Sequence, residues 1–142
     1  MKKIELVNVK YDGYERLYKI ILTNDSERIM FAYSVEPDEY IESGFYQFDS
    51  KKIVEAKFFI EWVREVNLSV EKQVMILQDI ENSSHVHCIG IVEKIIEDDS
   101  FTCNLGDFGT VIVELEKNNR DIHENMKVEF TGNLSVEINK TT

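Results

Sequence analysis

The clearest pattern in the chain is a strict alternation of apolar and polar residues near its C-terminus. In "KVEFTGNLSVEI", residues 127–138, the apolar side chains fall on even positions: Val128, Phe130, Leu134, Val136 and Ile138. A period of two predicts a strand with one buried face, and Gly132 interrupts that face. A glycine there favours a bend or bulge, as in a sheet that curls toward a barrel.

Two shorter alternations precede this strand. Phe101, Cys103 and Leu105 share one face of "FTCNL", and "TVIVELE" places Val111 and Val113 together with the leucine that follows. The full order is a long strand from residue 85, an "EDDS" turn, a strand, a "GDFG" turn, a strand, a polar segment and the bent strand. Over residues 84–139 this pattern resembles an OB-type small barrel.

The N-terminal third, residues 1–48, predicts a β-meander followed by an acidic, aromatic loop. The runs "KIELVNVKY", "RLYKIILT" and "ERIMFAYSV" are separated by "DGYE" and "NDSE", and Asp12-Gly13 is a turn signal. Pro37 ends the third run, and we expect a loop over "EPDEYIESGFYQFDS", residues 36–50.

Residues 49–82 form the segment for which a helix is expected. Asp49 or Ser50 can cap a first turn, and an apolar stripe with spacing i, i+3, i+4, i+7 follows. The stripe consists of Phe59, Trp62, Val63 and Val66. A strand with Phe58, Ile60 and Trp62 on one face is the alternative. Residues 68–82 fit either a second helix capped by Ser69 or a buried strand at "VMIL". The expected fold class is therefore α+β, predominantly antiparallel, in one domain of residues 1–142.

The acidic net charge of the chain favours some classes of binding partner over others. The net charge is −11, and the half after residue 70 carries 6 cationic against 14 acidic residues. Such a surface repels phosphate backbones, so nucleic-acid binding is disfavoured even for an OB-like barrel. The acidity would steer a basic protein partner, or it serves only to keep the protein in solution.

Two acidic stretches are the candidate partner-binding sites. In the first, tyrosines alternate with carboxylates: Asp38, Glu39, Tyr40, Glu42 and Tyr46. Tyrosine gives rigid contact area, and the carboxylates suit lysine or arginine on a partner. The alternative is a loop whose aromatic side chains fold back, which is the expectation for Phe45 and Phe48. The second stretch is Glu97, Asp98 and Asp99, expected at a solvated hairpin tip.

The stretch "HVHCIGIV", residues 85–92, raises the question of a metal site. His85 and His87 would share one face of a strand, but a third ligand would have to come from His123 in a distant polar segment. We therefore expect no metal and no cofactor. Cys103 is expected in the core, and nothing supplies Cys88 with the oxyanion hole or orienting acid of a catalytic cysteine.

No P-loop, GxGxxG, GxSxG, HExxH or EF-hand pattern occurs, so an enzyme is not expected. Size, acidity and missing catalytic motifs resemble the small bacterial immunity proteins that block nuclease toxins. That resemblance implies a non-enzymatic inhibitor of a basic toxin. A phage- or host-encoded inhibitor or adaptor and a small-molecule-binding β-barrel are the alternatives. No segment is apolar enough to span a membrane, and a cytoplasmic location is expected.

Overall fold

The chain is almost entirely β-structure in its computed structural model, which describes residues 2–23, 28–71, 73–119 and 121–139. Within those ranges there is no α-helix, and the short helix η1 (Gly106–Phe108) is a 3-10 turn. The strands are β1 (Lys2–Gly13), β2 (Glu15–Leu22), β3 (Arg28–Val35), β4 (Ile41–Val63), β5 (Asn67–Leu68), β6 (Met75–Leu77), β7 (His85–Glu97), β8 (Ser100–Asn104), β9 (Thr110–Leu115) and β10 (Lys127–Ile138). The prediction of an α+β fold with one or two helices is therefore wrong, whereas its OB-like β portion agrees with the structure.

The first part of the segment expected to be a helix, residues 49–63, lies in β4, and a bulge explains the error. Phe58 and Ile60 are buried two residues apart, and a register shift then makes Val63 the next buried residue. Spacings of two and three along a bulged strand imitate the spacing of a helical stripe. Residues 41–53 are mostly exposed, so they show no alternation. The turn expected at residues 24–27 lies outside the described residues.

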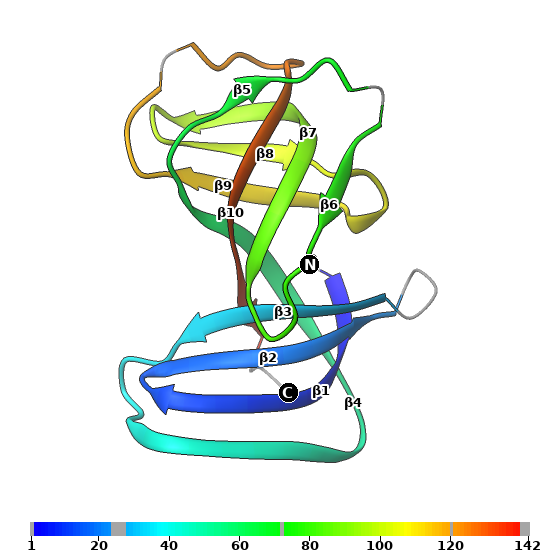
Figure 1. The fold of residues 1–142 in the computed structure, drawn as a ribbon, viewed down its shortest axis with the longest axis vertical. Coiled ribbons are helices and arrows are strands. Elements are labelled where there is room, and N and C mark those ends of the chain that lie inside the picture. Colours follow the sequence, from blue (N-terminus) through cyan, green and yellow to red (C-terminus); the bar gives the residue numbers. More distant parts are fainter. Residues whose placement is uncertain (1, 24–27, 72, 120, 140–142) are drawn as a thin grey trace. The chain divides into compact units, whose positions relative to one another are not determined.

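The chain divides into two compact units, and both contain residues of β4 and β10 (Figure 1). Unit 1 consists of Met1–Lys57, Ile80–Ser84 and Ser135–Thr142, and unit 2 of Phe58–Asp79 and His85–Leu134. That residues 1–142 form one domain stays a prediction.

Unit 1 is built on the expected N-terminal meander. β1, β2 and β3 pair antiparallel in chain order, and β4 runs antiparallel along the free side of β1. β10 pairs parallel with β3 at Ser135 and Tyr33, and the Asn139 N–H donates to the Glu55 carbonyl over 2.8 Å. These pairings enclose a core that contains Ile4, Leu6, Val9, Ile20, Leu22, Met30, Ala32, Ala56 and Val136.

Unit 2 has the strand order expected from the C-terminal pattern. β7, β8 and β9 form an antiparallel meander, β10 runs antiparallel along β7, and β4 pairs parallel with β9. The core prediction is confirmed for Val111, Val113, Val128, Phe130, Leu134 and Val136, all of which are buried. Ile138 is only half-buried.

Gly132 lies where two strands approach each other closely, and the bend expected there stays a prediction. A Cβ atom at this position would lie 2.7 Å from Ile60 Cγ2 and 2.8 Å from the Glu61 carbonyl oxygen. Real Cβ atoms do not approach backbone so closely, so only glycine fits. Gly132 therefore allows β10 to pack directly against β4 in unit 2.

The two units share one connection order although their sequences show no repeat. Each consists of a three-stranded meander, a strand antiparallel to its first member and a strand parallel to its last member. In unit 1 the antiparallel strand is β4 and the parallel strand is β10. In unit 2 the antiparallel strand is β10 and the parallel strand is β4. β4 and β10 also pair with each other. This is the arrangement of an OB-type barrel.

Candidate partner-binding site

The first group of predicted site residues lies at one end of unit 1. Asp38 and Glu39 lie in the connection between β3 and β4, Tyr40 precedes β4, and Glu42 and Tyr46 belong to β4 itself. The loop expected over residues 36–50 is therefore only residues 36–40, because strand β4 already begins at Ile41. All five predicted side chains are exposed.

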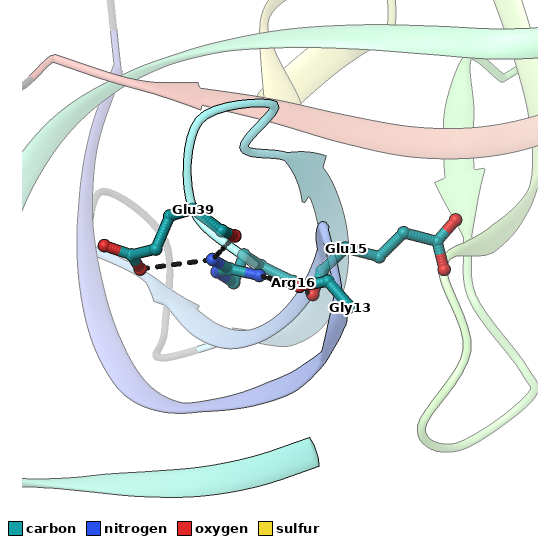
Figure 2. Close-up of polar contacts among 4 residues, drawn as sticks. All are labelled: Gly13, Glu15, Arg16 and Glu39. Carbon is teal, nitrogen blue, oxygen red and sulfur yellow. Dashed lines mark hydrogen bonds and ion pairs between the residues drawn. The ribbon is translucent and has the colours of Figure 1, made fainter. Parts of the chain in front are cut away.

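A buried arginine lies beneath this end of the unit (Figure 2). Arg16, in β2, is 2 % exposed. Its Nη1 donates to the carbonyl oxygens of Gly13 at 3.0 Å and Glu15 at 3.1 Å. Its Nη2 donates to the Glu39 carbonyl at 2.8 Å and to Glu39 Oε1 at 3.1 Å. A buried charge requires partners of this kind, because removal from water would otherwise be costly.

Arg16 thereby joins two chain segments that are far apart in sequence. One segment is the β1–β2 turn, where Gly13 takes a φ of +70°, and the other is the β3–β4 connection. The Glu36 N–H adds a bond of 2.8 Å to the Tyr14 carbonyl. The Arg16 guanidinium also lies 4.9 Å from the centre of the Tyr11 ring, at a distance suited to a cation–π contact.

These contacts place two exposed tyrosines against each other. The rings of Tyr14 and Tyr40 meet edge to face with centroids 5.1 Å apart. They are 48 % and 62 % exposed, so most of each side chain is open to a partner. Carbon atoms of the Tyr40 ring lie 3.5 Å from where a Cβ on Gly13 would be, so the ring packs over this glycine. The pair is therefore both exposed and held in place.

The remaining aromatic residues of this stretch lie further along β4. Tyr46 is 50 % exposed and contacts Phe48 edge to face at 4.9 Å. Phe45 is 63 % exposed, so the expectation that it folds back is wrong. There is no helix for it to cover, and its register partner in β1 is Lys10. Six residues of extended chain span about 20 Å, so Tyr40 and Tyr46 are separate contact points.

Arg16 and Tyr14 were missed by the sequence analysis, although a signal for Arg16 exists. Ile20 and Leu22 of β2 are core residues, and Arg16 lies at an even number of residues from both of them. The period of two places Arg16 on the same inward face. Tyr14 has no comparable signal, because its contact with Tyr40 depends on the pairing of distant strands.

The second predicted group lies in unit 2, at the β7–β8 hairpin. Glu97 ends β7, and Asp98 and Asp99 form the turn. Glu97 and Asp98 are exposed, as expected for a hairpin tip, and Asp99 is half-buried. Glu97 and Asp98 line a pocket of about 370 Å³ together with Phe101 and Leu115. Backbone bonds from Leu115 to the Asp99 carbonyl (2.8 Å) and from Asn119 to the Asp98 carbonyl (2.9 Å) fasten the hairpin.

Two of the histidines that raised the question of a metal site, His87 and His123, contact other residues in the structure. His87 Nε2 lies 2.5 Å from Glu129 Oε2 on the neighbouring strand β10. His123 lies in the segment between β9 and β10, where its backbone N–H donates to Met126 Sδ. Among the described residues, no group of three or more His, Cys, Asp or Glu side chains could hold a metal ion.

Both cysteines are buried, which confirms the core prediction for Cys103. Burial, with a smaller contribution from Glu93, raises the pKa of the Cys103 thiol to about 12. A thiol held in its neutral form is a poor nucleophile. Gly90, in the neighbouring strand β7, lies against the Cys103 sulfur, and a side chain at position 90 would overlap that sulfur.

The raised pKa of Cys103 predicts a loss of stability at alkaline pH. An unfolded thiol loses its proton near pH 8.5, roughly, whereas the folded thiol keeps it up to about pH 12. The stabilising contribution is complete below the unfolded pKa and decreases as pH rises through this window. Between pH 9 and 11, the parent should lose about 1.4 kcal/mol of unfolding free energy per pH unit more than Cys103→Ala. Urea denaturation measures both slopes, and parallel slopes would show that the thiol is not protected.

Comparison with known proteins assigns no family to the chain. No model of a protein family, no curated protein sequence and no solved structure matches the chain. In the part of the chain that the structure describes, no helix is long and apolar enough to cross a membrane. The proposals below therefore depend on the geometry and charge of this chain alone.

Proposed function

We propose that the protein is a non-enzymatic acidic binding protein that neutralises a basic protein partner. The class we infer is an immunity protein or antitoxin-type inhibitor of a bacterial toxin with nuclease activity. As part of this proposal the protein acts in the cytoplasm, where two buried thiols suit the reducing conditions. A phage- or host-encoded inhibitor of another basic protein would use the same binding chemistry.

The observation that carries the proposal is the exposed pair of Tyr14 and Tyr40. Tyrosine is enriched among the residues that dominate binding energy at protein interfaces, and a side chain already held in place loses less entropy on binding. Arg16 holds both connections that carry the pair. Asp38 and Glu42 flank it with exposed carboxylates.

The carboxylates of this site do not all have the same role. Glu39 Oε1 accepts a hydrogen bond from the buried Arg16, although its side chain is 67 % exposed. Replacing Glu39 would therefore disturb the loop as well as the surface charge. Asp38 and Glu42 are the better positions for testing electrostatic steering, which acts mainly on the association rate.

The pocket in unit 2 supports the second candidate function, a small-molecule-binding barrel. Its volume of about 370 Å³ lies at the lower end of the range for small-ligand sites, ~300–1,000 Å³. Unit 2 contains 6 cationic and 14 acidic residues, so a small ligand there would be cationic.

The experiment that tests the proposal is affinity capture from lysate of the source cells, with the captured protein then purified. We expect a basic protein that is retained at low salt and released at high salt. Tyr40→Ala should speed its dissociation by about 30-fold, the change that corresponds to an interface residue worth about 2 kcal/mol. Surface plasmon resonance with the purified partner measures this rate.

Ile53→Ala is the matched control, because Ile53 is an exposed side chain of unit 1 in β4 and lies away from the tyrosine pair. Its dissociation rate should equal that of the parent. Capture of no basic protein at low salt would overturn the proposed function. Equal dissociation rates for Tyr40→Ala and the parent would overturn the assignment of the site.

A further inference from the structure

Trp62 has a backbone conformation that a large side chain rarely adopts. It is the single tryptophan of the chain, its φ is +62°, and its side chain is 63 % exposed. A non-glycine residue in this region is under backbone strain, and such strain gathers at functional sites.

The surrounding structure holds the strained conformation in place. Trp62 lies in the bulge of β4, between the fully buried residues Ile60 and Val63. Gly132 of β10 packs directly against this stretch of backbone. With both neighbours fixed in the core, the bulge directs the indole toward solvent. The outward position of Trp62 is therefore built into the packing of unit 2.

The pocket at the β7–β8 hairpin begins next to this bulge. Val63 is the register partner of Leu115, and the Glu116 N–H donates to the Val63 carbonyl over 2.9 Å. Leu115 lines the pocket, whose other apolar residues are Ile95, Phe101 and Ile122. Glu97 and Asp98 supply acidic groups to the same pocket. Apolar residues and carboxylates in one pocket suit a side chain with an apolar stem and a cationic end.

Like charges are also concentrated beside the bulge. Partial burial and the carboxylates of Glu61 and Asp99 raise the pKa of Glu114. Carboxylates so close together repel one another, and a cation placed among them would relieve that repulsion. Tryptophan is the aromatic side chain that attracts cations most strongly through its ring face.

We propose that Trp62 and the adjacent acid-edged pocket of unit 2 receive a lysine or arginine side chain of the basic partner. This inference rests on the proposed function, because it names the chemistry of the partner. The stem of the basic side chain contacts the apolar residues of the pocket, and its charge lies near Glu97 and Asp98. The Trp62 indole contacts the partner beside the pocket. Trp62 is thus an exposed partner contact of unit 2.

The test uses a probe that requires no partner. N-acetyl-arginine amide is titrated into the full chain, and N-acetyl-citrulline amide, which has nearly the same shape but no charge, is the reference. We expect saturable NMR shifts at millimolar arginine probe for the Trp62 indole N–H and the backbone amides of Asp98 and Leu115. The citrulline probe should shift none of them.

Two variants and one control make the outcome specific. Trp62→Gly should fold, because glycine adopts a positive φ without strain, and it should weaken probe binding by about tenfold. The double variant Glu97→Gln, Asp98→Asn should have an effect of similar size. Asp107→Asn removes an exposed carboxylate of the η1 turn in the same unit and should bind like the parent.

The inference is overturned if the arginine probe gives no saturable shift, if citrulline binds equally well, or if the parent and both variants bind alike. Such a result leaves the proposed function standing when Tyr40-dependent capture of a basic partner is observed. Failure of capture in the lysate experiment overturns the proposed function, whatever the probe does. The two failures are therefore distinguishable.

Discussion

Phe130→Ala is expected to lower the free energy of unfolding by about 3–5 kcal/mol. Phe130 is 3 % exposed in the core of unit 2, and its ring meets that of Phe101 edge to face at 6.3 Å. Its register partner in β7 is the buried Cys88. Truncation removes the buried apolar area and leaves a cavity between strands β7, β8 and β10, which the closely paired ladders cannot readily fill.

Urea or thermal denaturation measures this loss. Thr131→Ala is the matched control, because Thr131 is the next residue of β10 and is exposed. Its effect should stay within about 0.5 kcal/mol. A loss below about 1 kcal/mol for Phe130→Ala would contradict the packing of the even-numbered face of β10 into the core.

Arg16→Ala is expected to lower the free energy of unfolding by about 3 kcal/mol. It would leave the carbonyl oxygens of Gly13, Glu15 and Glu39 without the donors that they now have. The Glu39 carboxylate is mostly exposed and can return to water, so the expected loss lies at the lower end for a buried ion pair.

Arg16→Lys separates charge from geometry. Lysine keeps the positive charge but lacks the planar group that reaches both segments with two nitrogen atoms, so it should recover only part of the loss. Lys19→Ala, on the opposite face of β2, is the control and should change stability little. Full recovery with lysine, or no loss with alanine, would show that Arg16 does not hold the two connections together.

The sequence predicted the β-structure well where one face of a strand is buried along its length. Phe101, Cys103, Val111, Val113 and the even positions of β10 alternate without interruption, and all but the half-buried Ile138 lie in the core. Such alternation reflects a physical requirement, because successive side chains of a strand point to opposite faces. The OB-like order of unit 2 follows from it and from the turns between the strands.

The helix prediction failed where the alternation is broken or absent. The bulge at Trp62 shifts the buried positions of β4 from even to odd residue numbers. The first half of the same strand is exposed on both faces, so its sequence does not alternate and does not indicate a strand. The division of β4 and β10 between two units also has no local signal. It depends on pairings between segments far apart in the chain, which a pattern of neighbouring residues does not contain.

The candidate site was predictable in part for a similar reason. Tyr40 was identified from composition, because an aromatic residue among carboxylates is conspicuous in a sequence. Its edge-to-face partner Tyr14 and the underlying Arg16 come from a different hairpin. The strain at Trp62 is a property of the folded backbone and has no sequence signal beyond the residue itself.

The central claim is that acidic groups attract a basic partner and that Tyr40 then holds it. The most direct measurement is the stopped-flow association rate of the captured partner as a function of ionic strength, for the parent and for the double variant Asp38→Asn, Glu42→Gln. The association rate of the parent should fall steeply as salt screens the attraction beyond about 8–10 Å. The double variant should associate more slowly than the parent at low salt, and its dissociation rate should stay close to that of the parent. Asp49→Asn, an exposed control in β4, should match the parent. An association rate that is independent of salt and unchanged in the double variant would contradict the claim.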